Sequence, residues 1–451
     1  MRTTIKTLLV CLTSGLLTSP VWADAFPNPE VEGPIPFKLP AGGDAHDYPF
    51  YSQADWLAVR DYVEEEFFLS GQANAYDLES GEVLQSGIPY KTRLVVRRPA
   101  SAVDFNGTVL LEWQNVTAGY DLDALWSSFR DDFVADGYAW IGISAQRVGV
   151  NQLRNWSPVR YGSLDVTNGG TVERDAVSYD IFGQAAQAIR SPQGINVMGG
   201  LPIREIIGKG ASQSAGYMAP FYNVVMPKYS QSIDLLLLAV GGGETRDDLD
   251  VPVFRILSET DVLGRAARNA ALPVNSELEI TWEIAGTSHS SYEGFVGRLD
   301  VFARDQGSAA ALPACDNPAY PRVPASRAYQ AAYAHMVDWV RLGKVPPAAP
   351  FIKREGNTLA RDERGMVSGG IQLAEYAVPT AHNTGSNSGS GFCRLYGSHE
   401  PYSTEKLLQL YDNALDYLQQ TMAVNDANIT AGFLLRPGAA KTVAAAIQKG
   451  M

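Results

Sequence analysis

An apolar run that ends in a serine among small residues constrains the fold of this 451-residue chain more than any other feature. The run spans residues 206–210 (IIGKG) and continues as ASQSAG over 211–216. This pattern is typical of a strand that turns sharply into a helix, with a strained serine, Ser212, at the turn and small residues two positions to either side. Gly210 and Ser214 occupy those positions. Small residues after a strand also form ordinary turns, so the motif needs support from elsewhere in the chain.

Three further apolar runs follow Ser212, and two of them end in residue types that a serine nucleophile needs. The runs span 233–240, 251–257 and 278–285; Glu259 and Asp261 follow the second, and His289 follows the third. The order serine, acid, histidine is that of α/β-hydrolase triads. Because the carboxyl ends of parallel strands meet at one crevice, three strand ends can bring these side chains together.

The three residue types have separate roles in this chemistry. A serine hydroxyl such as that of Ser212 becomes nucleophilic when an imidazole, here His289, takes its proton and later returns it to the leaving group. A buried carboxylate orients the imidazole and stabilises its cation. Asp261 is the better candidate because it lies at the outer end of its run, and Glu259 remains the alternative.

Histidine is scarce in the chain, which narrows the choice of base. Besides His289 the sequence contains His46, His335, His382 and His399. We expect His46 in a loop rich in Gly and Asp, His335 on an amphipathic helix, and the last two in polar loops. Each is predicted to be a hydrogen-bonding residue of the surface or core.

Acyl transfer also requires backbone N–H donors for the developing oxyanion. We expect one donor to be the amide of Gln213, at the amino terminus of the helix after the nucleophile. The second would come from the loop after the strand at 107–112, where Gln114 and Asn115 are the candidates. The alternative is that this loop is a structural turn.

Several segments together resemble a family of secreted α/β-hydrolase-domain proteins. They are EWQNV at 112–116, YDIFGQAA at 179–186, GASQSA at 210–215, SETD at 258–261 and AGTSH at 285–289, and the resemblance extends from Arg93 to about Leu418. In that family the serine before Gln-Ser is similarly placed as nucleophile, so the G-x-S-Q-S form is a family variant. The resemblance implies a carboxylic-ester hydrolase and leaves the substrate open.

Strand and helix patterns alternate through the middle of the chain, which predicts an α/β fold with a mostly parallel central sheet flanked by helices. Strands are expected at 93–97, 107–113, 138–144 and 203–207, and helices at 56–68, 125–136, 175–190, 326–342 and 407–422. The expected divisions are a signal peptide (1–23), an N-terminal segment packing on the core (24–90), the catalytic core (91–312) and an appended C-terminal region (313–451) that completes or covers the core.

An irregular insertion is expected at 146–170, just after a strand end. It contains Arg147, Trp156 and Tyr161, which could form walls of a substrate crevice. The alternative is a surface loop whose aromatic residues cover the fold.

The amino terminus has the composition of an export signal. Arg2 and Lys6 precede an apolar stretch at 8–17, and small residues near Ala23-Asp24 suit cleavage. No later run reaches the ~20 residues of a membrane helix, so we expect an exported protein without a membrane anchor. Removing residues 1–23 takes away two positive charges and changes the formal charge from −13 to −15.

This acidity makes nucleic acid an improbable partner, because binding phosphates needs clustered Lys and Arg. It argues mildly against polyanionic substrates too, although a local basic patch could override the net charge. Cys315 and Cys393 are expected to pair in an oxidising compartment. No HExxH spacing or Cys/His cluster points to a metal, and the triad chemistry requires no cofactor.

The expected function is therefore that of an exported serine esterase acting on a small-molecule or polymer-borne ester. An amidase, a peptidase or an acyltransferase with the same triad is one alternative, since triad geometry does not choose the leaving group. A hydrolase-fold binding protein without turnover is the other. The sequence leaves the oligomeric state open.

Overall fold

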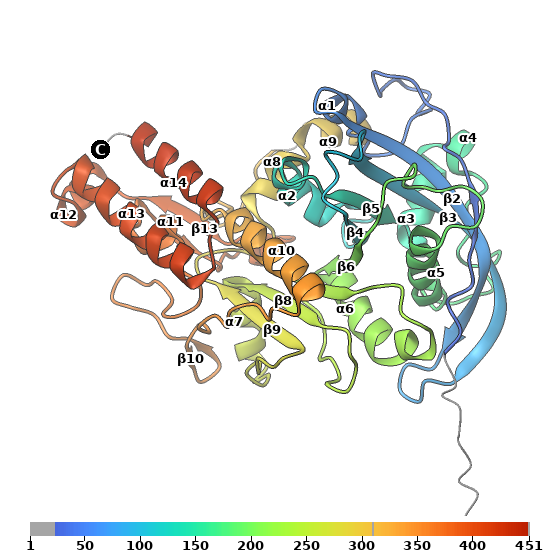
Figure 1. Cartoon of the computed structure of the whole chain (residues 1–451). Coiled ribbons are helices and arrows are strands. Elements are labelled where there is room, and N and C mark those ends of the chain that lie inside the picture. The colour runs from blue at the N-terminus through green and yellow to red at the C-terminus, as the bar shows by residue number, and fades with distance from the viewer. Residues whose placement is uncertain (1–22, 309–310, 450–451) are drawn as a thin grey trace, which may run out of the picture.

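A nine-stranded sheet organises the computed structural model, which describes residues 23–308 and 311–449 (Figure 1). Residues 1–22 of the predicted signal peptide lie outside the described residues. The strands of this sheet are, in chain order, β1 (Glu30–Glu32), β2 (Tyr62–Tyr76), β3 (Val83–Pro99), β4 (Thr108–Trp113), β5 (Ala139–Ile143), β6 (Glu205–Ala211), β7 (Leu235–Ala239), β8 (Val253–Ser258) and β9 (Glu279–Ile284).

The sheet changes from antiparallel to parallel along its width. Its spatial order is β1-β2-β3-β5-β4-β6-β7-β8-β9. Pairing is antiparallel from β1 across to the β3–β5 pair, and parallel from β5 to β9. The predicted α/β class with a mostly parallel central sheet is confirmed. Residues 24–90 supply β1, β2 and the start of β3, so they extend the sheet.

Helices cover both faces of the sheet and extend beyond one edge of it. They are α1 (Ala54–Ala58), α2 (Ala124–Ala135), α3 (Arg147–Trp156), α4 (Pro158–Tyr161), α5 (Ser178–Arg190), α6 (Gln213–Pro220), α7 (Glu259–Ala267), α8 (Tyr292–Gly297), α9 (Leu299–Gln306), α10 (Ala325–Leu342), α11 (Ala374–Ala377), α12 (Thr404–Leu410), α13 (Ala414–Ala431) and α14 (Arg436–Lys449). Shorter elements are a π-helical turn (Phe221–Val225), two 3₁₀ turns (Met226–Lys228 and Cys393–Leu395), and the strands β10 (Arg354–Glu355), β11 (Thr358–Leu359), β12 (Ala381–Thr384) and β13 (Ser398–Pro401).

The central strands are apolar on both faces, as expected for a parallel sheet covered on two sides. Alternate residues of β4 face opposite layers, because side chains in a strand point to the two faces in turn. Val109 and Leu111 join the core cluster that includes residues of α5 and α6, whereas Leu110 joins the cluster with residues of α2 and α10. The carboxyl ends of the strands therefore emerge between two packed layers, where they are held rigidly.

The helix expected at 56–68 is wrong over most of its length. The helix α1 ends at Ala58, and the chain enters β2 at Tyr62, where it pairs with β3. The physical reason is tertiary: Glu64 and Glu66, good helix formers alone, are buried and form ion pairs with arginines of β3. These pairs and the strand ladder outweigh local helix propensity.

The insertion at 146–170 is not the irregular loop that was expected. It folds into α3 and α4, and it buries Val150, Leu153 and Tyr161 against the core. The Ser157 side chain accepts a hydrogen bond from the backbone of Arg160 and so caps α4. The crevice wall was predicted at Arg147, Trp156 and Tyr161, whereas the spacing of the apolar residues of this segment suits a helix packed on the sheet.

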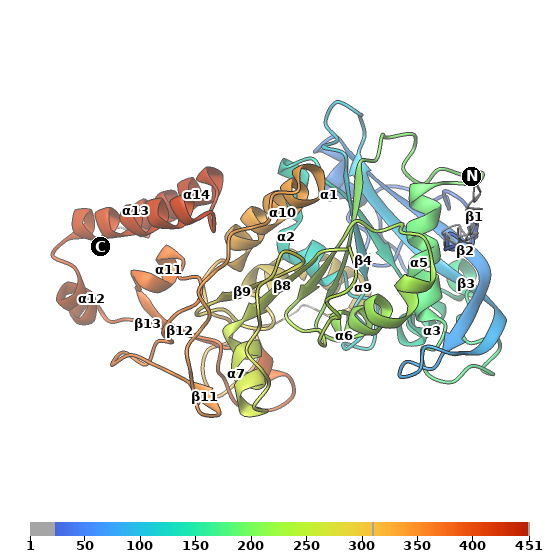
Figure 2. The ribbon, with the colours of Figure 1, turned by 60° about the horizontal axis from the view of Figure 1, so that its bottom comes forward.

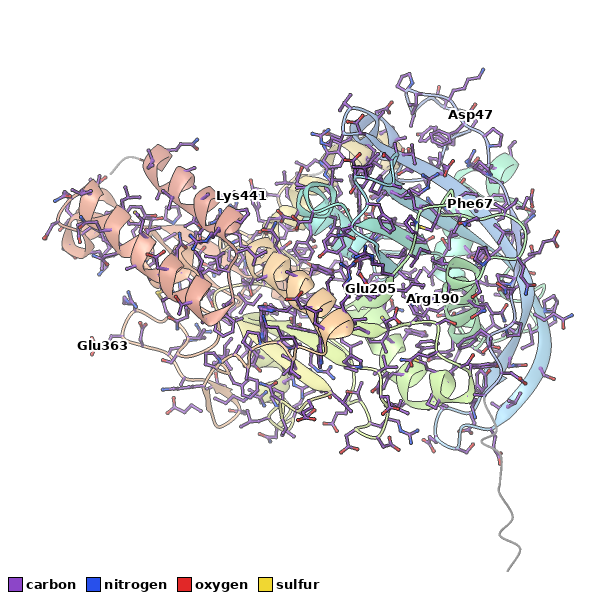
Figure 3. The ribbon with its side chains drawn as sticks, in the orientation of Figure 1. Asp47, Phe67, Arg190, Glu205, Glu363 and Lys441 are labelled. Atoms are coloured by element: carbon purple, nitrogen blue, oxygen red, sulfur yellow. A yellow bond between two sulfur atoms is a disulfide. The ribbon has the colours of Figure 1, made fainter. Side chains whose placement is uncertain are left out.

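The C-terminal region packs against the core through α10. In Figures 1 and 2, α10 lies between the sheet and the pair α13 and α14. Lys441 on α14, labelled in Figure 3, donates to Asp132 on α2 at 2.7 Å. The predicted helix at 407–422 is interrupted at 411–413, because Asn413 caps a new helix, α13.

The predicted disulfide between Cys315 and Cys393 is present. It joins the segment before α10 to the 3₁₀ turn at Cys393–Leu395 and closes a long stretch of chain. None of the helices within residues 23–308 and 311–449 is long and apolar enough to cross a membrane.

Candidate active site

The turn at Ser212 has the strained geometry that its sequence predicts. Ser212 joins β6 to α6 with φ 57° and ψ −117°, a conformation that L-residues seldom adopt. A Cβ at Gly210 would lie 2.8 Å from the sulfur of Met218 and 2.9 Å from the amide of Ala215. Only glycine therefore fits at that position while α6 starts where it does.

Ser214 replaces the second glycine of the usual motif, and its environment explains why a serine fits. The side chain is fully buried, and its hydroxyl lies 2.9 Å from both the amide and the carbonyl oxygen of Ala211. The hydroxyl thus bonds to the backbone of the turn. The serine side chain therefore fits where the usual motif has glycine, and it adds hydrogen bonds that a glycine could not make.

The histidine joins the other two predicted triad residues into one chain of hydrogen bonds. His289 Nε2 lies 2.7 Å from Ser212 Oγ, and His289 Nδ1 lies 2.6 Å from Asp261 Oδ1. The three side chains follow the ends of β6, β8 and β9 in the parallel part of the sheet, where β8 and β9 are adjacent and β7 separates them from β6. The structure therefore places the three residues within hydrogen-bonding reach, in the arrangement that activates a serine.

Asp261 is held by the first turn of α7. Its Oδ2 accepts bonds from the backbone N–H and the hydroxyl of Ser258, at 3.0 and 2.5 Å, while the Ser258 hydroxyl also accepts from the Asp261 amide. This reciprocal pair is a capping box, a motif that stabilises a helix start by about 1 kcal/mol. The cap fixes one carboxylate oxygen and leaves the other directed at His289.

Burial and charge act in opposite directions on the two ionisable groups. Burial opposes ionisation of Asp261, but the neighbouring His289 and the hydrogen bonds from His289 and Ser258 outweigh it and lower the pKa of Asp261. Burial likewise disfavours the imidazolium, but the carboxylate of Asp261 outweighs it and raises the pKa of His289. A carboxylate that stays ionised and an imidazole that gains basicity are what proton transfer from Ser212 requires.

Glu259, the alternative acid, makes a different set of contacts. Its Oε1 accepts from Arg361 at 2.9 Å and from Thr384 at 2.7 Å, and its Oε2 accepts from the amide of Gly286 at 3.0 Å. The side chain is fully buried and no bond joins it to His289. Glu259 therefore ties α7 and the loop after β9 to the C-terminal region.

The loop after β4 meets the elbow, but its predicted oxyanion donors are already engaged. The amides of Gln114 and Asn115 donate to Ile143 O and Leu122 O, and the Asn115 side chain donates to Ala211 O. The amide of Gln213 opens α6, where first-turn amides lack an intrahelical acceptor. The amide of Val116, which the sequence reading overlooked, contacts only the Gln213 side chain, at 3.5 Å.

The three predicted substrate-wall residues lie away from the triad. Tyr161 is fully buried and donates to Glu66, and Trp156 stacks on His46 with ring centroids 4.2 Å apart. Arg147 is exposed at the start of α3. None of the three lines a cavity that contains Ser212, so the structure gives them a packing or surface role.

The other four histidines also lie outside these cavities. Three of them bond to oxygen atoms: His46 Nδ1 to Trp156 O, His335 Nε2 to Gly432 O, and His399 Nδ1 to Asn383 Oδ1. His382 and His399 lie on β12 and β13, not in the polar loops that were expected. Their surroundings leave His289 as the base candidate.

Two cavities meet at Ser212 and His289, and they differ in character. The aromatic cavity, of about 470 Å³, is lined mainly by apolar groups that include Tyr120, Phe129, Phe295, Tyr329, Phe392 and Tyr396. The arginine cavity, of about 630 Å³, is lined by Arg265, Arg268 and Arg394, together with glycines, polar side chains such as Asn387 and apolar ones such as Leu263. A substrate bound at Ser212 would contact both.

The C-terminal region forms part of both cavities, which the sequence did not reveal. Leu395 lines each of them, and its carbonyl oxygen accepts a bond from the amide of Ser290 at 3.0 Å. A Cβ at Gly385 would lie 2.5 Å from the amide of Thr260, so the chain after β12 packs tightly against the loops that carry the acid and the histidine. Long-range contacts of this kind leave no local sequence signal.

No group of three or more His, Cys, Asp or Glu side chains suited to a metal ion occurs in the part of the chain that the structure describes.

Comparison with known families agrees with this architecture. The family model described as "Alpha/beta hydrolase domain" matches residues 31–444, which is most of the chain. The chain belongs to this α/β-hydrolase domain family. The match includes the elbow, both carboxylate candidates, His289 and most of the C-terminal region, so the predicted family resemblance is confirmed at the level of the fold.

Solved structures resemble parts of the chain at low identity. A rice cell wall degrading esterase, LipA, from Xanthomonas oryzae is 14% identical over 40% of this chain and 42% of its own, with a TM-score of 0.24. A serine hydrolase without a lid from Xanthomonas campestris is 12% identical over 54% of this chain and 97% of its own (TM-score 0.29), and the esterase Est22 is 11% identical over 57% and 81% (TM-score 0.34). The chain thus spans less than half the length of LipA. A search of curated proteins finds no match.

Proposed function

We propose that this protein is an exported serine hydrolase that cleaves a carboxylic ester through an acyl-enzyme intermediate. The observation that carries the proposal is the position of His289, whose two ring nitrogens lie 2.7 Å from Ser212 Oγ and 2.6 Å from Asp261 Oδ1. A strained serine backbone and a buried carboxylate are both unfavourable for folding. Features of this kind are concentrated at sites that carry out a reaction.

The proposed reaction has two halves. Ser212 Oγ attacks the ester carbonyl carbon as His289 Nε2 takes its proton, and the imidazolium then protonates the departing alkoxide so that the alcohol leaves. In the second half, water attacks the acyl group on Ser212 while His289 accepts a proton from the water; the acyl–Oγ bond then breaks, His289 returns the proton to Ser212 Oγ, and the acid is released. Asp261 keeps Nδ1 protonated and Nε2 free to accept.

The oxyanion that forms in each half needs two N–H donors. The amide of Gln213 is the first, because it lies directly after the nucleophile at the start of α6. For the second we favour the amide of Val116, whose long contact with the Gln213 side chain can be given up when a substrate oxygen arrives. The occupied amides of Gln114 and Asn115 make them less suitable donors.

The proposed location is outside the cytoplasm, and the proposed partner is a small-molecule or polymer-borne ester. The Cys315–Cys393 disulfide is compatible with an oxidising compartment, and the basic and apolar residues at the amino terminus have the composition of a signal peptide. The proposed reaction uses protein groups and water alone.

Turnover of paired substrates tests the proposal. A panel of p-nitrophenyl esters of graded acyl length, run beside the matching p-nitroanilides, should show ester cleavage that exceeds anilide cleavage by at least a hundredfold in kcat/KM. Anilide cleavage equal to or faster than ester cleavage would favour an amidase or peptidase. A folded protein that turns over neither series would favour a binding protein.

A further inference from the structure

The arginine cavity is a basic site in an acidic protein. Arg265, Arg268 and Arg394 line it, and Asp261 is the one acidic residue among its described lining residues. Asp261 is already committed to His289 and to the cap of α7. The cavity therefore holds more positive charge than its own walls neutralise, although the whole chain carries a formal charge of −13.

Two of the three arginines have no ion-pair partner. The side chains of Arg268 and Arg394 are exposed, and neither one bonds to an acidic group within the described residues. Other exposed arginines, such as Arg147 and Arg436, also have no ion pair among the residues that the structure describes, so what distinguishes Arg268 and Arg394 is the cavity that they line. Their guanidinium groups line the same cavity as Ser212 and are free to bind a substrate group.

The third arginine has an unused donor in the interior. Arg265, on α7, donates through Nη2 to Ala271 O at 3.3 Å, but its Nε is buried and has no hydrogen-bond partner. Burial, together with the nearby charges of Arg255 and Arg354, lowers the pKa of Arg265. An anion in the cavity would offset that repulsion, and an unsatisfied buried donor calls for an explanation of this kind.

The position of the cavity connects this charge to the reacting atoms. Ser212 and His289 line it together with the three arginines, and the same two residues line the aromatic cavity. Arg265 comes from α7, directly after Asp261, whereas Arg394 comes from the C-terminal region; Figure 2 shows α7 beside β11 of that region. Two separate parts of the chain thus converge on one side of the nucleophile.

We infer that the arginine cavity binds a carboxylate of the substrate, so that the preferred ester carries an apolar group on one side of the ester bond and a carboxylate on the other. This inference rests on the proposed function. Guanidinium groups suit a carboxylate because their planar donors can bind both of its oxygens. The apolar part of the substrate occupies the aromatic cavity, whose walls include Phe295 and Tyr396.

Two pairs of esters test the inference, because the carboxylate can belong to the acyl or to the alcohol part. The acyl-side pair is 4-nitrophenyl hydrogen adipate and the ester in which the free carboxylate is replaced by a primary carboxamide. The alcohol-side pair is 3-carboxyphenyl butyrate and 3-carbamoylphenyl butyrate. Each pair differs in charge while keeping nearly the same size and the same ester bond.

In the wild-type protein we expect the carboxylate ester of one pair to have a kcat/KM at least tenfold above that of its carboxamide. Arg268→Gln and Arg394→Gln should each reduce that preference by up to about tenfold, because hydrogen bonds to charged groups contribute on this scale. The preference should also decrease with rising salt, since both guanidinium groups are exposed.

Arg436→Gln is the matched control, because Arg436 is an exposed arginine at the start of α14 and lines neither cavity. Equal rates for carboxylate and carboxamide in both pairs would overturn the inference and leave the proposed function intact, because the neutral esters still turn over. A preference that survives Arg268→Gln/Arg394→Gln would overturn it too. If no ester of either kind is cleaved by folded protein, the proposed function itself fails.

Discussion

Two regions of the molecule meet at Ser212, and they contribute different things. The parallel edge of the sheet supplies all three triad side chains, from the ends of β6, β8 and β9. The C-terminal region supplies no triad atom, yet Leu395 and Arg394 form cavity walls and Arg361 pairs with the buried Glu259. The reacting groups thus follow the ends of sheet strands, whereas the walls around them are shared: the core supplies Arg265, Arg268 and Phe295, and the C-terminal region adds Arg394 and Leu395.

If this division holds, changes at the sheet edge should affect every ester alike. Changes in the C-terminal region should alter stability or the choice of ester.

The largest effect is expected at the nucleophile and its base. Ser212→Ala and His289→Ala should each lower kcat for any ester by about 10⁴-fold or more, because they remove the proton transfer and the covalent step. The double variant should lose little more than either single one, since the residues act as a unit. Steady-state kinetics on one p-nitrophenyl ester measures all three; losses that simply multiply would contradict the shared role.

Asp261 and Glu259 both lie on α7, but the first bonds to His289 and the second to the C-terminal region. Replacing each by its isosteric amide should therefore affect catalysis in one case and stability in the other. Asp261→Asn should lower kcat by about 10³- to 10⁴-fold and the free energy of unfolding by only about 1 kcal/mol, the scale of the helix cap that it weakens. Glu259→Gln should instead lower the free energy of unfolding by about 1 to 3 kcal/mol, because it removes a buried partner of the partly exposed Arg361.

At a temperature where both variants are folded, Glu259→Gln should keep kcat within about tenfold of wild type. Denaturant unfolding and kinetics on the same samples provide the comparison. Equal losses of kcat in the two variants would mean that the contacts of Glu259 with Thr384 and Gly286 are as important for catalysis as the bond from Asp261 to His289.

The disulfide should matter for the C-terminal region and little for the triad. Replacing Cys315 and Cys393 together by serine should lower the free energy of unfolding by about 2 to 5 kcal/mol, since the bond closes a stretch with a sequence separation of 78 residues. Because Cys393 lies between two residues that line the cavities, Phe392 and Arg394, the profile of kcat/KM against acyl length should change shape. An equal decrease in kcat/KM for all esters would contradict the prediction that the C-terminal region affects the choice of ester.

The pH dependence should report the pair of His289 and Asp261. Because the carboxylate raises the pKa of His289, kcat/KM should rise with pH through a value above the ordinary 6.5, as the imidazole becomes able to accept a proton. In Asp261→Asn the residual activity should have its acidic limb at a lower pH. An acidic limb that stays in place would mean that another group controls the rate.

The same pKa shifts also determine how the free energy of unfolding changes with pH. The raised pKa of His289 stabilises the folded state below the unfolded pKa, and this contribution is lost as pH rises through the folded value. The lowered pKa of Asp261 stabilises above its unfolded pKa and is lost as pH falls through the folded value. The pair should therefore contribute most between the two unfolded pKa values, which thermal unfolding across pH can follow.

The sequence was sufficient for the sheet edge because the relevant signals there are local. Apolar runs ending in Ser212, Asp261 and His289 predict three strand ends, and parallel strands deliver their ends to one place. The choice between Asp261 and Glu259 stayed open at that stage. The Ser258-x-x-Asp261 spacing marks a helix cap, but only the structure gives the partners of each carboxylate.

The sequence failed where distant partners decide the structure. Glu64 and Glu66 favour a helix by local propensity alone. Their ion pairs with the arginines of β3 stabilise a strand instead, and these pairs cannot be seen in the local sequence. Trp156 and Tyr161 resembled a crevice wall because nothing local tells a buried aromatic side chain from a binding one. The cavity wall at Leu395 depends on folding the chain back across more than a hundred residues from Ser290.

One measurement tests the central claim most directly: labelling of the folded protein with a fluorophosphonate, followed by peptide mapping. We predict a single adduct on Ser212, absent in Ser212→Ala and formed much more slowly in His289→Ala, because the hydroxyl reacts only while the imidazole accepts its proton. No adduct on folded wild-type protein, or a Ser212 adduct that forms equally fast without His289, would contradict the claim that these side chains form a working nucleophile.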